Sequence, residues 1–192
     1  MGCNLASLFL AGFDFITLAK VSLKWVSAEI ERHREEFGKV STACPFDTLT
    51  HGITLMLMRE FVKVRKYAGH KSGLQKGDEE PFRRRVYLSI FFNPGRKVDD
   101  DQSFDSDLVE LKTNIEKGTD VTDLPEGIQR KAEKYLHIVR RGSHIRVTIN
   151  EAACSEAKKY HGYFALISNC EKEPFECLRK YRIGEKTEML AG

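Results

Sequence analysis

The sequence predicts a mixed α/β fold of the α+β kind, and three observations predict it. Helix, strand and helix patterns follow one another at both ends of the chain. Between them, Val, Ile, Phe and Tyr occur in short runs separated by glycines, which is typical of antiparallel strands, and two amphipathic helices come after these runs. With 192 residues, of which 41% are hydrophobic and 31% charged, the chain can form one core with a smaller insertion.

The first forty residues predict a helix, a strand and a second helix. Asn4 can cap a short helix, and Gly12 is the kind of residue that ends one. Phe13 to Ala19 follows as a buried strand. Ser22 is expected to open the next helix, in which Ile30 lies on the apolar face.

The middle of the chain predicts a sheet. Ile53 to Met58, Phe61 to Tyr67 and Arg84 to Phe92 are expected to be antiparallel strands. The last of these has a thin polar face, which indicates a central strand. A stretch rich in Gly, Lys and Glu, from Ala68 to Pro81, is expected to be a loop.

The next part predicts helices again. Asn93-Pro94-Gly95 is expected to be a turn, followed by an amphipathic helix from Asp105 to Lys117. A second helix is expected from Leu124 to Tyr135 and an alternating strand from Ile145 to Ile149. Asn150 is a good cap for a helix that begins at Glu151.

The end of the chain carries the clearest pattern. Tyr163 to Ser168 is a short apolar strand, and a helix is expected from Pro174 to Leu190 because proline suits the first helical position. On that helix Tyr181, Gly184 and Glu188 are three and four residues apart, so they lie on one face.

Charge is unevenly distributed although the net charge is only +3. Residues 59–96 are strongly basic, and residues 99–126 are strongly acidic. Three consecutive arginines, Arg83, Arg84 and Arg85, could hold phosphate groups, or they could form a charged strand edge that discourages aggregation. The two charge runs are equally consistent with solvated faces and with a surface that binds nucleic acid.

The cysteines and the N-terminus bear on the compartment. The five cysteines form no CxxC pair, which argues against a disulfide framework or a structural zinc site and favours a reducing compartment. Position six is Ala6, where N-myristoylation requires Ser or Thr. No stretch is long and apolar enough to cross a bilayer. We expect a cytoplasmic protein without a membrane partner.

Four segments, in this order, resemble the C-terminal half of DDE transposases of the insertion-sequence-4-like group. They are Gly12 to Lys20, Val86 to Pro94, Lys159 to Asn169 and Tyr181 to Glu188. The resemblance implies the C-terminal part of a ribonuclease-H-like transposase core at residues 1–40 and 151–192, with a β-rich insertion that includes helices at residues 41–150. It also implies DNA transposition by cleavage and strand transfer.

Such transposases hold two magnesium ions with Asp, Asp and Glu, because two metals stabilise the entering and leaving oxygens of a phosphodiester. The Glu lies in a signature Tyr-x2-Arg-x3-Glu-x6-Lys, which Tyr181 and Glu188 match. The resemblance therefore implies that Glu188 is the catalytic metal ligand and that Tyr181 contacts DNA.

The chain departs from the family pattern at several positions. Gly184 replaces the arginine, and the lysine would fall beyond Gly192. Neither catalytic aspartate has a counterpart, since Asp14 matches neither. We therefore expect a truncated chain that binds no magnesium and does not cleave DNA by itself. The expected partners are DNA at transposon ends, a full-length transposase or a second copy of the chain. The alternatives are a DNA- or protein-binding module without catalysis, or a decayed remnant.

Overall fold

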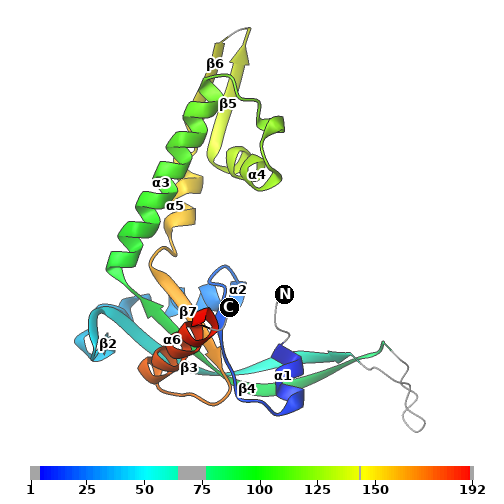
Figure 1. Ribbon diagram of the computed structural model, residues 1–192, viewed down its shortest axis with the longest axis vertical. Coiled ribbons are helices and arrows are strands. Elements are labelled where there is room, and N and C mark those ends of the chain that lie inside the picture. Colours follow the sequence, from blue (N-terminus) through cyan, green and yellow to red (C-terminus); the bar gives the residue numbers. More distant parts are fainter. Residues whose placement is uncertain (1–4, 65–76, 143, 191–192) are drawn as a thin grey trace. The chain divides into compact units, whose positions relative to one another are not determined.

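The computed structural model describes residues 5–64, 77–142 and 144–190, without the side chains of Arg141, His144 and residues 185–190 (Figure 1). The chain forms two compact units. Unit 1 comprises residues 1–92 and 164–192, and unit 2 comprises residues 93–163. Residues 43–92, which the sequence analysis assigned to an insertion, thus share a unit with the first forty residues.

Unit 1 is built on a five-stranded sheet with the order β1-β7-β4-β3-β2. Its strands are β1 (Ile16–Ala19), β2 (Ala43–Cys44), β3 (Asp47–Val64), β4 (Glu79–Phe92) and β7 (Tyr163–Ser168). The pairs β1–β7, β2–β3 and β3–β4 are antiparallel. The chain is therefore a mixed α/β protein with a mostly antiparallel sheet, which confirms the coarse fold class predicted from the sequence.

The longest feature of unit 1 is the hairpin of β3 and β4. The prediction of two separate strands, Ile53 to Met58 and Phe61 to Tyr67, was wrong because β3 is continuous for 18 residues. Arg59 and Glu60 do not interrupt it, since both face arginines of β4 across the ladder. The predicted loop from Ala68 to Pro81 is shorter on its C-terminal side, where β4 begins at Glu79, and residues 65–76 lie outside the described residues.

The central position predicted for the strand ending at Phe92 is confirmed. β4 lies between β7 and β3, and residues 86–91 are buried without interruption. By contrast, β1 is shorter and less buried than predicted. Phe13 precedes it and Leu18 lies within it, and their side chains are 63% and 56% exposed. The reason is that β1 is the edge strand of the sheet, with β7 on one side only.

The α-helices in the described part of unit 1 are α1 (Leu5–Ala11), α2 (Lys24–Arg32) and α6 (Pro174–Leu190). Two short 3-10 helices, η1 (Arg34–Glu36) and η2 (Val40–Thr42), follow α2. Gly12 ends α1 with a φ of 74°, a left-handed conformation that glycine adopts without strain. Asn4, the predicted cap, lies outside the described residues. Helix α2 begins at Lys24 rather than at Ser22 and has no side-chain cap.

The core of unit 1 forms where α6 packs on the sheet. Cys177 and Leu178 of α6 contact Phe91 of β4 and Leu166 of β7. The Phe91 ring stacks on Phe164 with a centroid separation of 4.8 Å. Burial raises the pKa of the Cys177 thiol to about 11, so this thiol stays protonated at neutral pH and packs as an apolar group. The four described cysteines are all free.

Unit 2 contains α3 (Pro94–Glu116), η3 (Val121–Asp123), α4 (Glu126–Tyr135), the hairpin of β5 (Leu136–Arg141) and β6 (His144–Ile149), and α5 (Glu151–Lys158). Helix α3 runs beside this hairpin (Figure 1). Leu111 and Ile115 of α3, Ala132 of α4 and Val147 of β6 meet in its core. Asn150 caps α5 as predicted, because its Oδ1 accepts a hydrogen bond from the Ala153 N–H at 3.2 Å.

The predicted turn at Asn93-Pro94-Gly95 is instead the start of α3. Asn93 is the N-cap and accepts a hydrogen bond from the Arg96 N–H at 2.9 Å, and Pro94 occupies the first turn. The helix therefore begins eleven residues before the predicted Asp105. Its first half carries few apolar residues and is stabilised instead by ion pairs one turn apart, such as Lys97 with Asp101 at 2.5 Å. The strand predicted at Ile145 to Ile149 is present as β6, whereas its partner β5 was not predicted.

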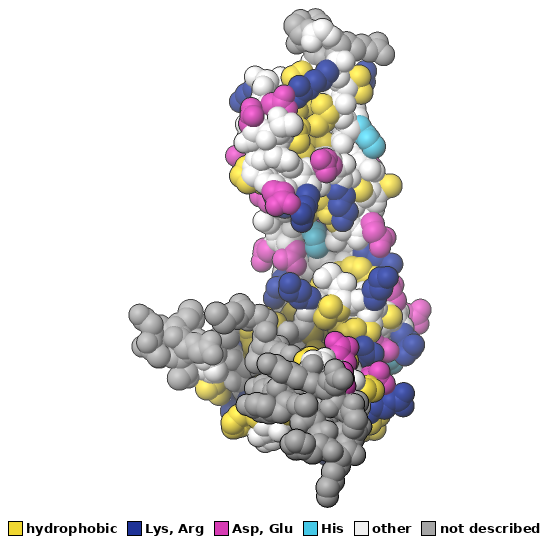
Figure 2. Space-filling view, turned by 90° about the vertical axis from the view of Figure 1, so that its right-hand side faces the viewer, with side chains coloured by type: hydrophobic (Ala, Val, Ile, Leu, Met, Phe, Trp, Pro, Cys, Tyr) yellow, Lys and Arg dark blue, Asp and Glu magenta, His cyan; other side chains and the backbone are white. Residues whose placement is uncertain are grey.

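The surface of the described residues mixes both signs of charge. Figure 2 shows acidic and basic side chains next to one another over much of the visible face. Within the described ranges, no helix is both long and apolar enough to cross a membrane.

Candidate nucleic-acid interface

Arg83, Arg84 and Arg85 lie in the part of β4 that is exposed to solvent. Across the ladder, Arg83 faces Glu60, Arg84 faces Arg59 and Arg85 faces Met58. Because successive side chains of a strand point to opposite faces, Arg83 and Arg85 share one face and Arg84 points to the other. The three arginines, which are consecutive in the sequence and were expected to act as one group, are therefore divided between the two faces of the hairpin.

The face with Arg83 and Arg85 is open and mostly positive. Glu60 is the acidic neighbour of Arg83, with its Oε2 at 3.6 Å from the Arg83 Nε and both side chains more than half exposed. We call the four side chains Met58, Glu60, Arg83 and Arg85 the arginine face. An exposed pair at this distance contributes little, so it leaves Arg83 able to bind another anion.

Aromatic rings support two of the three arginines. The Arg85 guanidinium lies 5.6 Å from the centre of the buried Tyr87 ring, and the Arg84 guanidinium lies 5.2 Å from the centre of the Phe82 ring. Neither guanidinium has a carboxylate within 4 Å in the described part of the chain. A ring under a guanidinium restrains its plane while its N–H donors remain free for a phosphate oxygen.

On the opposite face of the hairpin, the arginine side chains contact other groups of the chain. Arg59 stacks on Trp25 of α2 with its Cζ at 4.5 Å from the ring centre. Arg84 donates a hydrogen bond from Nη1 to the Arg83 carbonyl oxygen at 3.0 Å. Arg59 and Arg84 thus contact groups within the molecule, and Trp25, the sole tryptophan, is half-buried beneath Arg59 rather than free to stack on a base.

The second site predicted from the sequence lies between the end of β7 and the start of α6. Ser168 ends β7, and its Oγ accepts hydrogen bonds from the N–H groups of Cys170 and Glu171 at 3.1 and 2.8 Å. Asn169 accepts from the Phe15 N–H at 2.9 Å and donates to the Phe13 carbonyl at 2.9 Å, which ties the end of β7 to the start of β1. The Ser-Asn pair therefore fixes the backbone at this end of the sheet.

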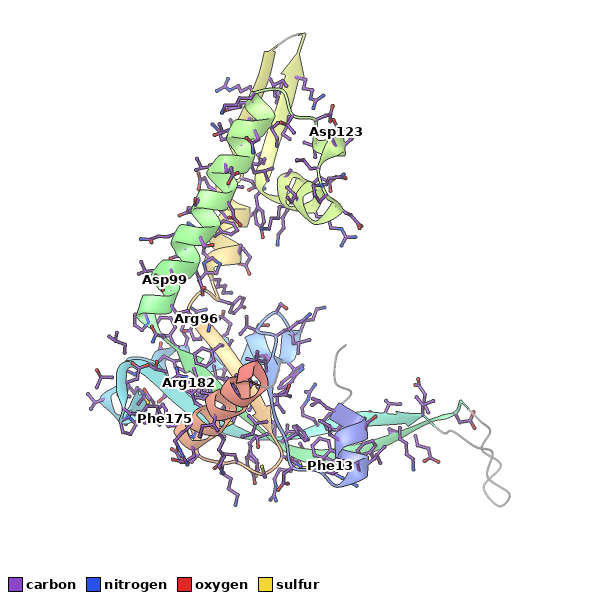
Figure 3. The ribbon with its side chains drawn as sticks, in the orientation of Figure 1. Phe13, Arg96, Asp99, Asp123, Phe175 and Arg182 are labelled. Carbon is purple, nitrogen blue, oxygen red and sulfur yellow. The ribbon has the colours of Figure 1, made fainter. Side chains whose placement is uncertain are left out.

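Helix α6 begins at Pro174 as predicted, and Glu173 caps it. The Glu173 Oε2 accepts hydrogen bonds from the N–H groups of Phe175 and Glu176 at 2.8 and 3.3 Å. Figure 3 labels Phe175 at the start of α6 and Arg182 further along it. Phe175 packs against the cluster of Phe91 and Leu166, which fixes the helix on the sheet.

The three residues predicted to share a face of α6 have different surroundings. Tyr181 is half-buried and packs against the same apolar cluster, so its ring has a packing role. Gly184 is exposed and has open space around it. Glu188 lies within the span of α6, but its side chain lies outside the described residues. Among the described side chains, no three His, Cys, Asp or Glu residues gather into a cluster that could hold a metal ion.

A cluster around Asp101 in unit 2 was missed by the sequence analysis. The Asp101 Oδ1 lies 2.7 Å from the His161 Nδ1, and its Oδ2 accepts a hydrogen bond from the Lys97 Nζ at 2.5 Å. Hydrogen bonds from Lys97 and from His161 lower the pKa of Asp101. Asp100 accepts a hydrogen bond from the Gly162 N–H at 2.9 Å. The sequence contains one sign of this cluster, the four-residue spacing of Lys97 and Asp101. That spacing places the two side chains next to each other only if the helix already begins at Pro94.

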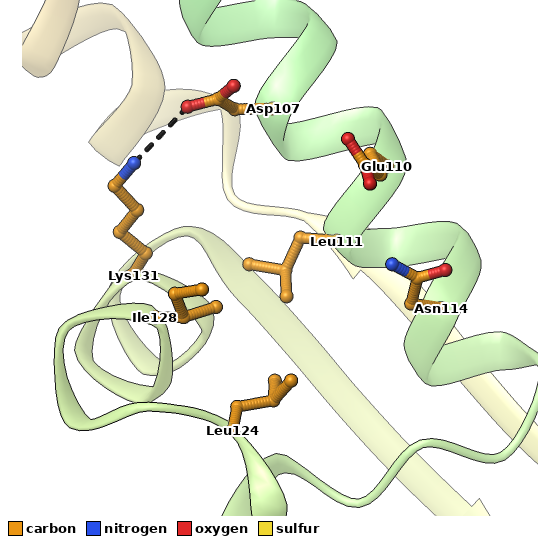
Figure 4. Close-up of a pocket in the computed structure, with 7 residues that line it drawn as sticks. All are labelled: Asp107, Glu110, Leu111, Asn114, Leu124, Ile128 and Lys131. Carbon is orange, nitrogen blue, oxygen red and sulfur yellow. Dashed lines mark hydrogen bonds and ion pairs between the residues drawn. The ribbon is translucent and has the colours of Figure 1, made fainter.

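Unit 2 also has a surface pocket between α3 and α4 with a volume of about 240 Å³ (Figure 4). Leu111, Leu124 and Ile128 supply its apolar wall. The Lys131 Nζ and the Asp107 Oδ2, 3.3 Å apart, close one side of it. Glu110 and Asn114 of α3 complete its polar lining.

Comparison of the chain with family models, with curated proteins and with solved structures finds no match.

Proposed function

We propose that this chain binds the phosphate backbone of DNA through the arginine face of the β3–β4 hairpin. The observation that carries the proposal is the pair of exposed arginines, Arg83 and Arg85, on one face with Glu60 as the nearby carboxylate. The backbone positions of Arg83 and Arg85 are separated by roughly 7 Å along the strand, so both side chains can reach phosphates of one DNA strand.

We further propose that this binding belongs to a transposase of the insertion-sequence-4-like DDE group, with a ribonuclease-H-like core. The four resembling segments support this proposal. So does the succession of β7, the Ser168-Asn169 pair and α6, because it is the order in which such an enzyme delivers its glutamate. In that assignment Glu188 is a magnesium ligand, and Tyr181 orients α6 by packing beneath it.

DNA binding is tested by fluorescence anisotropy with a labelled duplex at several salt concentrations. We expect the double variant R83A/R85A to weaken binding on the order of tenfold or more at 0.1 M salt, and to reduce the slope of log K against log salt by about 1.8. R84A is the matched control, since it removes the same side chain from the same strand but on the opposite face. Equal losses in both variants, or no binding by the wild type, would overturn the proposal.

Catalysis is tested separately. We propose that the chain alone does not cleave DNA, because one carboxylate cannot hold the two metals that phosphodiester cleavage requires. Supercoiled plasmid should stay intact with the purified chain in magnesium. Nicking that disappears in Glu188→Ala would show instead that the chain carries a complete site.

An alternative of another class is a module that contacts protein rather than DNA. The salt series distinguishes it, because phosphate binding weakens steeply as salt rises whereas an apolar protein contact does not. A remnant without a selected role would bind neither partner with measurable affinity.

A further inference from the structure

Strand β3 has one edge that, over most of its length, pairs with no other strand of the described residues. Its other edge pairs with β4 from His51 to Val64. On the free side, β2 pairs only at Asp47 and His51, so within the described residues no strand covers β3 from Gly52 to Val64. In an antiparallel ladder, every second residue of a strand directs its N–H and C=O away from the partner. This edge therefore offers a row of backbone donors and acceptors to another strand.

The part of this edge from Ile53 to Met58 lacks the usual protection against pairing. Edge strands are commonly protected by charged side chains, proline or a bulge. Ile53 to Met58 contains no charged residue, no proline and no glycine, and β3 pairs with β4 in one unbroken register. Met56 and Met58 are 65% and 63% exposed. The charges begin only at Arg59.

We propose that the free edge of β3 pairs antiparallel with the same edge of a second copy of this chain, around a twofold axis at Met58. Met58 is the middle residue of the span from Gly52 to Val64, so this register is the one that uses the whole free edge. The contact is isologous and closes after two copies. It goes beyond the proposed function and does not depend on DNA.

The charges of β3 favour this register. With the axis at Met58, residues whose numbers add up to 116 face each other, so Glu60 faces Met56 and Arg59 faces Leu57. An axis at Arg59 or at Glu60 would bring two like charges directly opposite each other, which is destabilising. An axis at Phe61 would set Arg59 opposite Lys63. An axis nearer the start of β3 would run the partner strand into β2.

The arrangement has a consequence for the arginine face. A twofold axis perpendicular to the sheet leaves corresponding faces of the two copies on the same side. Arg83 and Arg85 of both copies would then lie on one continuous sheet surface.

The first test measures the mass of the free protein by sedimentation equilibrium, without DNA. Met58→Lys and Met56→Lys are a matched pair, since both replace an exposed methionine on the same face of β3. We expect M58K to weaken the dimer tenfold or more, because two ammonium groups meet at the axis. M56K should keep or tighten it, because each new lysine faces the partner's Glu60. A wild type that stays monomeric at 0.1 mM, or equal effects of the two variants, would overturn the proposal.

The second test uses cross-linking and does not depend on the stability of a charged variant. In a background with Cys3→Ser and Cys170→Ser, Met58→Cys should form an intermolecular disulfide on mild oxidation, because residues directly opposite lie about 5 Å apart at their Cα atoms. Met56→Cys is the control, since the two copies of residue 56 would be offset by four residues, about 13 Å. Equal cross-linking of both variants would contradict the register. Because sedimentation and cross-linking are measured without DNA, a failure of this proposal is distinguishable from a failure of the proposed function, which the anisotropy titration of the wild type tests by itself.

Discussion

Unit 2 and the hairpin of unit 1 carry comparable densities of charge but arrange them differently. In unit 2, acidic side chains of the run from residue 99 to 126 lie within 4 Å of a cation contributed by α3, α4, β5 or α5. These pairs are Arg96–Asp100, Lys97–Asp101, Lys158–Asp105, Lys131–Asp107, Lys112–Glu116 and Arg140–Asp120. Six carboxylates of the acidic run are thus paired with cations inside the unit.

In the hairpin, by contrast, the three consecutive arginines contact aromatic rings or a single carboxylate. Arg84 and Arg85 rest on aromatic rings, and Arg83 has one exposed carboxylate at 3.6 Å. An aromatic ring restrains a guanidinium without cancelling its charge. A run of charged residues therefore indicates a binding partner only when the fold leaves those charges without opposite charges beside them. By this criterion the basic run, and not the acidic one, is the surface that we propose for DNA binding.

The largest expected effect on stability is at Gly162, which lies against the start of the ion-paired helix α3. Gly162 has a φ of 79°, and a Cβ there would lie 2.7 Å from the Lys97 Cβ and 2.8 Å from the Asn93 carbonyl oxygen. Gly162→Ala should lower the free energy of unfolding by about 2–4 kcal/mol through overpacking and backbone strain. Urea denaturation measures it.

Gly12→Ala is the matched control, because Gly12 has a φ of 74° and nothing within 4 Å of an added Cβ. It carries the backbone strain without the clash, so its cost should be about 1 kcal/mol. Equal losses for the two variants would show that the contact of Gly162 with the start of α3 contributes nothing.

The sequence predicted elements that have their own local signals. Gly12 marked the end of α1, Asn150 the start of α5, and Pro174 the start of α6, because caps and terminators act on the residues next to them. The first half of α3 was not predicted, since its aspartates provide no apolar periodicity. The continuity of β3 was not predicted either, because it depends on pairing with β4 and not on local composition.

The candidate site could likewise be predicted only in part from the sequence. The three arginines were identified from composition, but their division between two faces follows from strand geometry and became clear only with the register. The contact of Asp101 with His161 joins residues that are 60 positions apart, and no local pattern reports such a distance. The role of Glu188 remains a proposal that rests on the resemblance.

A smaller effect is expected at Glu60, the carboxylate of the arginine face. Glu60→Gln removes a negative charge beside Arg83 while keeping the shape of the side chain. DNA affinity should rise by roughly two- to fivefold at low salt, and the gain should shrink as salt screens the charge. Glu79→Gln is the control on the same hairpin, about 13 Å along β4 from Arg83. An equal gain in both variants would mean that the effect is one of net charge alone.

The smallest expected effect is a change in thermal stability that depends on the ion pairs of unit 2 and occurs only at acidic pH. The pKa of Asp120 is lowered to about 2, first by the hydrogen bond from Arg140 and then by the N–H of Thr122. Because the folded-state pKa lies below the ordinary value of 3.8, this carboxylate stabilises the fold above about pH 4 and loses its contribution as the pH falls towards 2. Melting temperatures between pH 5 and pH 2.5 should therefore fall less steeply in Asp120→Asn than in the wild type. Arg140→Gln should reduce the slope as well but leave part of it, since the Thr122 N–H still donates to the carboxylate. If Arg140→Gln keeps the full slope of the wild type, the pairing within unit 2 does not neutralise Asp120, and the contrast with the hairpin weakens.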